Sequence, residues 1–274
     1  DVIFPPAAMG AIIAVIGLEL APVAANMAGL TGDKIDMVNV AISMFTLAVG
    51  VIGSVAFRGF MSIIPILFGV VCGYVFAAIM GIVNFQPVID APWFQVPHFY
   101  APVFDINAIM IIAPAALVVL AEHIGHLVVT GNIVDRDLIK DPGLSRSLFA
   151  DGLSNVISGF AGATPNTTYG ENIGVMAITK VYSTWVIGGA AVMAIILSFC
   201  GKLSELIHSI PVPVMGGICI LLFGVIAASG IRVLVERQVD YSKSSNLVMT
   251  SVIMIIGLSG AKLSFGAFSV QGMV

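Results

Sequence analysis

The feature that most constrains this chain is a series of apolar runs, each close to the length of one bilayer crossing. A helix of about 20 apolar residues crosses the hydrocarbon core, where every backbone N–H and C=O must be paired within the protein. Helices meet that requirement, so the runs predict an all-α polytopic membrane protein. The expected crossings are residues 3–29, 38–57, 61–83, 106–134, 182–208, 212–235 and 246–262, with a shorter segment at 147–161 and a half-length helix at 171–181.

The composition excludes most soluble classes of protein. Hydrophobic residues make up 59% of the chain and charged residues 9%, and the mean hydropathy is +1.09. Soluble domains carry about 25% charged residues. The net charge of -4 is scattered through loops, so it indicates neither a nucleic-acid-binding surface nor an acidic tail. Cys72, Cys200 and Cys219 lie in apolar runs without paired spacing, and we interpret them as small core residues.

Lys and Arg divide unevenly between the two sides of the membrane. If 147–161 and 171–181 count as two crossings, eight bases fall on one side and three on the other. By the positive-inside rule the eight-base side is cytoplasmic. Residues 84–105, rich in Pro and aromatic side chains, then form an extracytoplasmic loop. The eight bases are Arg58, Arg136, Lys140, Arg146, Lys180, Arg232, Arg237 and Lys243, and the three are Lys34, Lys202 and Lys262.

Residues 147–180 are interrupted in a way that a continuous helix cannot tolerate. Glycines and a proline break the segment, and residues 164–169 carry almost no apolar side chains. Unpaired backbone at membrane depth is tolerated only where protein buries it or where it lines a wet cavity, and interrupted segments mark transporter binding sites. The pattern therefore predicts a binding site around 164–169. An ordinary extramembrane turn between two short helices remains the alternative.

Three ionisable side chains lie inside the crossing at 106–134: Glu122, His123 and His126. Glu122 and His126 are four residues apart, so they share one helix face and can touch, while His123 points about 100° away. Ionisable groups at bilayer depth are costly and are usually functional. A carboxylate in contact with an imidazole could exchange a proton near neutral pH, as a proton-coupled carrier requires. A structural helix-packing pair is the alternative.

A second carboxylate, Glu171, follows Gly170 at the expected start of the half-length helix. The free N–H groups of the first turn and the positive end of the helix dipole stabilise a carboxylate there. The same amides could donate to a ligand carbonyl. Two carboxylates with exposed amides therefore predict a neutral, planar, polar ligand such as a nucleobase or another cyclic amide. Ordinary helix capping is the alternative for Glu171.

Two stretches 206 residues apart resemble each other. Residues 5–12 read PPAAMGAI and residues 211–218 read PVPVMGGI, and these stretches open the first and the eighth expected segments. Seven crossings of separation imply opposite orientations, as an inverted-topology repeat requires. Proline followed by small residues is common at the start of membrane helices, so coincidence is the alternative.

Residues 171–180, ENIGVMAITK, resemble the signature of the nucleobase-ascorbate transporter family, the nucleobase:cation symporters. That signature has an acid or Gln, then Asn, a Gly two residues further on, and a Thr followed by a basic residue. Residues 121–127 (AEHIGHL) and 164–171 (TPNTTYGE) resemble the bacterial uracil permease branch, and the similarity runs over the whole chain. We therefore expect this chain to be a fragment of a longer family member, without its N-terminal and last C-terminal segments.

The resemblance implies a fold of fourteen segments in two inverted repeats of seven, divided into a gate domain and a substrate-holding core domain. On that pattern residues 1–83 and 209–274 are gate helices and 84–105 are the extracytoplasmic loop. Residues 106–208 are core, with an interrupted segment at 164–181 in which 164–169 form a short strand before the half-helix. Whether two copies associate through the gate helices stays open.

The resemblance also implies import of uracil, or a related nucleobase, by proton symport across a bacterial inner membrane, with the proton as coupling ion and no cofactor. Glu122 and Glu171 would hydrogen-bond the base, and Gly170 would supply a backbone contact. His126 would act with Glu122 in proton coupling, and Tyr169 would be an orienting neighbour. An acid rather than an amide at position 171 favours pyrimidines over purines.

Other functions remain as alternatives. A purine or another nucleobase could be the substrate, or the protein could be a passive channel. An intramembrane metalloenzyme is a further alternative, because His123 and His126 at i and i+3 beside Glu122 superficially resemble a zinc-site helix. The order Glu-His-x-x-His is not the usual protease order, and no third ligand has a supporting spacing. We therefore predict neither a metal site nor an enzyme.

Overall fold

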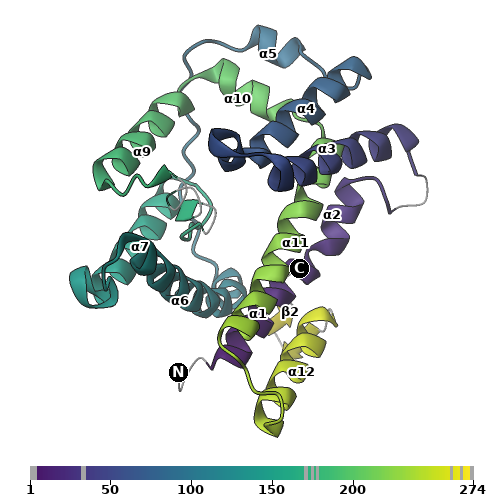
Figure 1. Cartoon of the computed structure of the whole chain (residues 1–274). Coiled ribbons are helices and arrows are strands. Elements are labelled where there is room, and N and C mark those ends of the chain that lie inside the picture. The colour runs from purple at the N-terminus through teal and green to yellow at the C-terminus, as the bar shows by residue number, and fades with distance from the viewer. Residues whose placement is uncertain are drawn as a thin grey trace. The chain divides into compact units, whose positions relative to one another are not determined.

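The computed structural model describes residues 5–31, 35–169, 172–173, 176, 179–259, 262–265 and 268–271. Its elements are α1 (Pro6–Glu19), α2 (Ala21–Met27), α3 (Met37–Ala56), η1 (Gly59–Ile63), α4 (Pro65–Ile79), α5 (Gln86–Asp90), α6 (Ile106–Val134), η2 (Ile139–Gly143), α7 (Leu144–Phe160), α9 (Thr184–Ser198), α10 (Gly201–His208), α11 (Val212–Glu236), α12 (Ser244–Leu258), β1 (Lys262–Phe265) and β2 (Phe268–Gln271) (Figure 1).

The chain forms two compact units. The first unit comprises residues 1–85 and 209–274, and the second unit comprises residues 86–208. In the first unit, helices from the two ends of the chain therefore pack together, whereas the second unit is one continuous stretch of sequence.

In the first unit, α1 and α2 run along α11 in the opposite direction (Figure 1). A Cβ atom at Gly230 would lie 2.6 Å from the Gly10 carbonyl oxygen, and one at Gly17 would lie 2.5 Å from the Ala227 nitrogen. At the other end, a Cβ at Gly216 would meet the backbone where α2 ends. Small residues at these positions let the two backbones touch, which is how helices without a hydrophobic driving force associate in lipid.

Both α1 and α11 begin after a proline with almost the same backbone conformation. Pro5 has φ -65° and ψ 144°, and Pro211 has φ -64° and ψ 143°. A residue in this extended conformation ahead of a helix leaves the first turn free to form, and proline supplies the required φ without strain. The two stretches that resemble each other in sequence therefore start their helices in the same way.

Helices α3 and α4 pack beside α11 and complete the buried part of the first unit. Ile42, Ala77 and Val214, one residue from each of these three helices, form its apolar centre. Thr46 is fully buried and its hydroxyl donates to the Ile42 carbonyl oxygen at 2.8 Å. That internal bond satisfies the hydroxyl, so a polar residue can lie inside an apolar contact.

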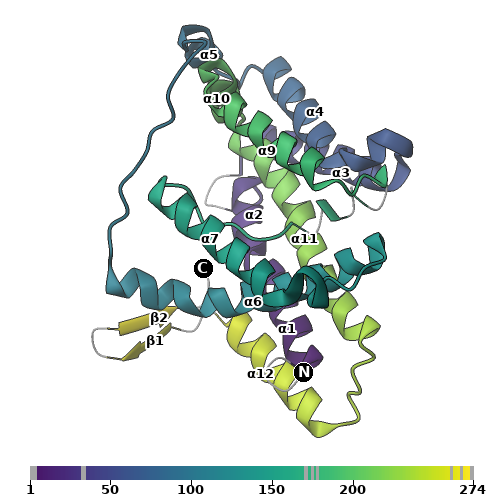
Figure 2. The same cartoon turned by 90° about the vertical axis from the view of Figure 1, so that its left-hand side faces the viewer.

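In the second unit, α6 is the longest helix, with 29 residues. The Asp105 side chain caps it by accepting from the backbone N–H groups of Asn107 and Ala108. At the other end of this unit, α10 lies against α5, and Figure 2 shows the two side by side. The Lys202 ammonium donates to the carbonyl oxygens of Val88 and Ile89, which satisfies the end of the short helix.

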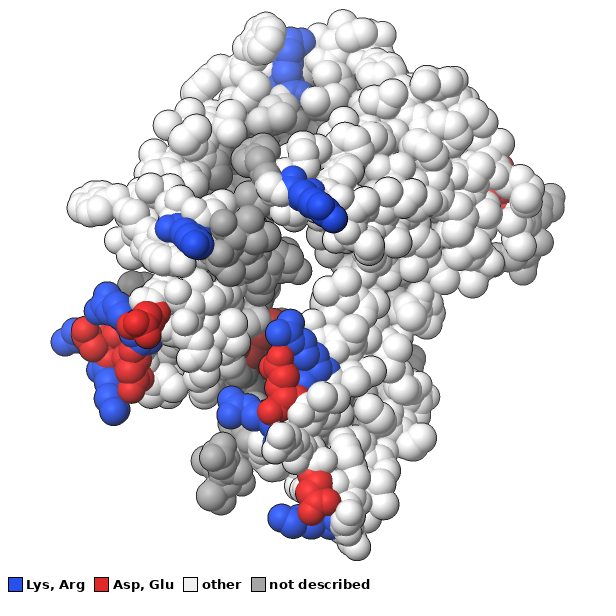
Figure 3. All heavy atoms as spheres, viewed as in Figure 1, with Lys and Arg blue, Asp and Glu red and all other residues white. Residues whose placement is uncertain are grey.

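The prediction of a helical membrane protein is confirmed in outline. Within the described residues, three helices are long and apolar enough to cross a bilayer: Pro6–Met27, Met37–Ala56 and Val212–Glu236. Large apolar side chains are widely exposed, among them Val55 at 84% and Trp185 at 89%, as expected where lipid rather than water is the solvent. Charged side chains are sparse on the face shown in Figure 3.

The crossing expected at 182–208 is not one straight helix. The structure divides it into α9 and α10, which meet at a bend of 87°. The aromatic ring of Phe199 stacks on the ring of Phe94 at this bend. The backbone carbonyl oxygen of Phe199 accepts a hydrogen bond from the Gln95 N–H at 2.9 Å. The loop that contains Gln95 thus supplies the hydrogen bond that a straight helix would have given to the Phe199 carbonyl. The apolar run at 182–208 by itself does not indicate this partner.

The strand expected at residues 164–169 is wrong, because the structure leaves this segment irregular. A strand needs a neighbour to complete its hydrogen bonds, and in the described residues the one sheet is the antiparallel pair β1 and β2. Of the half-length helix expected at 171–181, Asn172, Ile173, Met176 and Thr179 are helical. Residues 171, 174–175 and 177–178 lie outside the described residues.

We predict that Gly17→Ala destabilises the protein and that Gly224→Ala does not. The new methyl group at position 17 would collide with the α11 backbone at Phe223 and Ala227, whereas a Cβ at Gly224 meets nothing within 4 Å. Overpacking of this kind costs about 1–3 kcal/mol. The melting temperature of the full-length protein in detergent measures the difference. Equal melting temperatures for the two variants would contradict the close α1–α11 contact.

Candidate functional site

The predicted site residues on α6 lie about one helical turn apart. Glu122 and His126 are both half-buried, whereas His123 between them is only 4% exposed. Four residues make slightly more than one turn, so Glu122 and His126 occupy the same side of α6 and His123 turns toward another neighbour. The shared face that the spacing predicts is therefore present.

His126 joins α6 to the irregular segment 163–169. Its Nδ1 atom lies 3.0 Å from the Thr168 hydroxyl oxygen in a hydrogen bond. The next residue, Tyr169, is exposed. The structure thus brings His126 next to the segment that leads to Gly170 and Glu171, although these two predicted site residues lie outside the described residues.

The irregular segment 163–169 runs back along α7 and is held there by side chains. The Asn166 N–H donates to the Asn155 amide oxygen at 2.6 Å, and the Asn166 amide nitrogen donates to the Ser158 hydroxyl at 3.0 Å. These bonds replace the backbone partners that a helix or sheet would supply. Non-helical backbone is tolerated at membrane depth under that condition.

The reversal at the end of α7 depends on Gly162. Its φ is +78°, in the left-handed region, and a Cβ there would lie 2.6 Å from the backbone nitrogen of Tyr100. Glycine satisfies both conditions because it has no side chain. The turn that starts the returning segment is thus fitted closely against the loop before α6.

Sequence reasoning missed a second contact of α6, between His123 and Ser147 at the start of α7. His123 Nε2 and the Ser147 hydroxyl oxygen lie 2.7 Å apart in a hydrogen bond. The helical spacing correctly placed His123 away from the Glu122 face, but it could not name the partner, because Ser147 is 24 residues away in the chain. Thr168 was missed for the same reason.

Two side-chain atoms in the described part of the chain are buried without a hydrogen-bond partner. They are His123 Nδ1 and the Thr167 hydroxyl oxygen. Buried polar atoms are normally paired, and an exception calls for a specific explanation. Both atoms belong to the two segments, α6 and 163–169, that carry the predicted site residues or lead to them.

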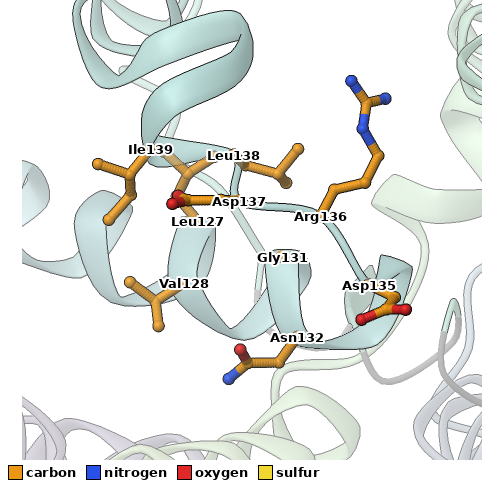
Figure 4. Close-up of a pocket in the computed structure, with 9 residues that line it drawn as sticks. All are labelled: Leu127, Val128, Gly131, Asn132, Asp135, Arg136, Asp137, Leu138 and Ile139. Atoms are coloured by element: carbon orange, nitrogen blue, oxygen red, sulfur yellow. The ribbon is translucent and has the colours of Figure 1, made fainter.

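A pocket lies at the C-terminal end of α6, away from Glu122 and His126. It has a volume of about 380 Å³ and includes none of the predicted site residues (Figure 4). Ion pairs beside it join Arg136 to Asp141 at 2.9 Å and Lys140 to Asp137 at 3.4 Å. These side chains are largely exposed, so the pairs add little stability. The pocket is lined by Leu127, Val128, Gly131, Asn132, Asp135, Arg136, Asp137, Leu138 and Ile139.

The described residues do not bring three or more His, Cys, Asp or Glu side chains together in a group that could hold a metal ion. In particular, His123 and His126 bind different partners, Ser147 and Thr168. The described geometry therefore gives no support to the metalloenzyme alternative.

Comparison with known proteins gives a consistent result. A model of the Permease family matches residues 1–265. The chain is 65% identical over 276 residues to a uracil permease of Escherichia coli (strain K12), covering 100% of this chain and 64% of that protein. It is 62% identical over 279 residues to a uracil permease of Paenibacillus larvae subsp. larvae, covering 100% of this chain and 66% of the relative.

A third relative, a uracil permease of Bacillus subtilis (strain 168), is 46% identical over 284 residues, covering 99% of this chain and 65% of that protein. The chain thus spans slightly less than two thirds of the length of these curated relatives. All three are permeases, which are transport proteins and not enzymes.

We predict that Gly162→Ala lowers the melting temperature of the protein, while Gly159→Ala in the last turn of α7 leaves it nearly unchanged. A non-glycine residue in the left-handed region costs about 1–2 kcal/mol, and the methyl group would also collide with Tyr100. A Cβ at Gly159 meets nothing within 4 Å. Thermal unfolding of both variants in detergent provides the test, and an unchanged Gly162→Ala protein would refute the close turn.

Proposed function

Because this chain belongs to the Permease family, we propose that it is part of a secondary active transporter that imports uracil by proton symport. The observation that carries the proposal is the 65% identity to a uracil permease over the whole chain. The substrate, the coupling ion and the direction of transport belong to the complete protein, of which this chain matches slightly less than two thirds in its relatives. We place it in a bacterial inner membrane, since these relatives are bacterial.

Glu122 and Glu171 hold the base in this proposal, each carboxylate accepting an N–H of the planar uracil ring. Gly170 adds a backbone contact and Tyr169 is an orienting neighbour. The bond from His126 to Thr168 supports this arrangement, because it ties the Glu122 face of α6 to the segment immediately before Gly170. Uracil carries N–H donors and C=O acceptors in one plane, so carboxylates and free amides together complement its edge.

Proton coupling is assigned to Glu122 and His126. Their i, i+4 spacing on α6 and their shared half-buried position support the assignment. A carboxylate and an imidazole at this separation can pass one proton between them, and occupancy by the substrate then changes which group holds it. In this proposal the proton is the coupling ion, and proton transfer between Glu122 and His126 needs no cofactor.

Alternating access requires two bodies that move against each other. We propose that the second unit carries the core (residues 106–208) and that the first unit carries gate helices (1–83 and 209–274), with 84–105 as the extracytoplasmic loop. The division of the chain into these two compact units supports the proposal. The antiparallel pairing of α1 with α11, each started by a proline, supports an inverted repeat as the underlying symmetry.

We expect an inward proton gradient to stimulate saturable uptake of radiolabelled uracil into proteoliposomes that contain the full-length protein. Glu122→Gln and Glu171→Gln should each abolish gradient-driven uptake, since an amide cannot carry the proton or the charge. Glu236→Gln is the matched control, because Glu236 is exposed and pairs with Arg232 at the end of α11.

The same assay separates the alternatives. A passive channel would conduct without saturation and without response to the gradient. Absence of uracil uptake by well-folded protein would overturn uracil as the substrate and make other nucleobases, purines included, the next candidates.

A further inference from the structure

His123 has no part in the proposed transport chemistry, yet it is the most buried of the three ionisable residues in this part of α6. It is 4% exposed, against the half-buried Glu122 and His126. Its ring therefore faces the contact between α6 and α7, where Nε2 meets the Ser147 hydroxyl at 2.7 Å. A side chain in this position acts on the neighbouring helix and not on a ligand at the Glu122 face.

The two histidine contacts lie close together along the axis of α6. His123 and His126 are three residues apart, which is about 4.5 Å along the helix axis. Their partners, Ser147 and Thr168, are far apart in sequence, at the start of α7 and beyond its end. Thr168 can reach α6 because segment 163–169 turns back along α7, as the two bonds of Asn166 to Asn155 and Ser158 show.

The outcome is a closed arrangement of three segments. His123 ties α6 to α7, Asn155 ties α7 to the returning segment, and His126 ties that segment back to α6. Removing one of these ties opens the arrangement, so the place of Thr168 relative to the Glu122 face depends on the His123–Ser147 bond as well.

An imidazole at position 123 carries a cost that an apolar side chain would avoid. Its Nδ1 atom is buried and has no partner among the described residues. An unpaired buried polar atom costs about 1–3 kcal/mol. What a histidine offers here, and a leucine of similar size does not, is the hydrogen bond from Nε2 to Ser147.

We propose that His123 is a positioning residue of the uracil site. Through Ser147 it fixes α6 against α7, and this keeps the Glu122 and His126 face in place beside the segment that leads to Glu171. The inference rests on the proposed function, and it adds a residue that touches neither the base nor the transferred proton.

The chain allows a test with closely matched variants. In His123→Gln the amide reaches the position of Nε2 and can still bond Ser147, whereas the shorter amide of His123→Asn reaches only the position of Nδ1. Ser147→Ala removes the same bond from the other side. Ser154→Ala is its control on α7, because Ser154 is exposed and its hydroxyl bonds only its own helix, at the Asp151 carbonyl.

Equilibrium binding of radiolabelled uracil to the full-length protein in detergent is the readout, with the melting temperature measured alongside. We expect His123→Asn and Ser147→Ala each to weaken binding by up to about tenfold, because the arrangement that binds uracil can lose at most the net worth of this one hydrogen bond. His123→Gln and Ser154→Ala should bind uracil like the wild type. The His123→Asn, Ser147→Ala double variant should bind no more weakly than the weaker single variant, because both remove one shared bond.

Two results would overturn the proposal. If His123→Asn and Ser147→Ala lower the melting temperature but leave uracil affinity unchanged, the bond serves stability alone. If His123→Gln loses as much affinity as His123→Asn, the bond to Ser147 is not the cause. Failure of the proposed function is seen separately, since the wild type itself would then not bind uracil, and this inference would fall with it.

Discussion

The first unit depends on the close approach of two helix backbones. Lipid tails are as apolar as leucine side chains, so burial of apolar surface gives helices in a bilayer little reason to associate, and close packing has to hold them. Gly10, Gly17 and Gly230 let α1 and α11 touch along their lengths, and Gly216 does the same where α2 ends. With these backbones in contact, α3 packs against α11 and α12 packs against α1. Each of these glycines lies where a methyl group would occupy the partner's backbone.

The second unit solves a different problem, which is how to keep irregular backbone inside a membrane protein. In this unit hydrogen bonds between polar side chains hold the segments together, whereas in the first unit close contact at small residues does so. Asn155 and Ser158 hold Asn166, and the two histidines of α6 reach Ser147 and Thr168. Each bond joins segments that helix periodicity alone would leave independent. A unit held by a few specific hydrogen bonds can place site residues closely while its outer surface stays apolar, as the exposed side chains of α9 show.

Particular residues show how far the site could be predicted. The shared face of Glu122 and His126 followed from the 3.6-residue period of a helix, and the break after α7 followed from Gly162 and the polar run behind it. The contacts of His123 and Thr168 could not be predicted, since their partners lie 24 and 42 residues away in the chain. The bend inside the expected crossing at 182–208 could not be predicted for a related reason, because Phe94 and Gln95 stabilise it at Phe199 from outside the apolar run.

The sequence by itself determined that this is a helical membrane protein, where most of its helices lie, and that Glu122 and His126 share a face. These properties depend on hydropathy and on hydrogen bonds between residues four apart, which are local. Only the tertiary structure decided that 163–169 returns along α7, that α9 and α10 meet at 87°, and that His123 pairs with Ser147. Such features depend on partners far away in the chain, and a distant partner leaves no periodic signal in the sequence around the residue it binds.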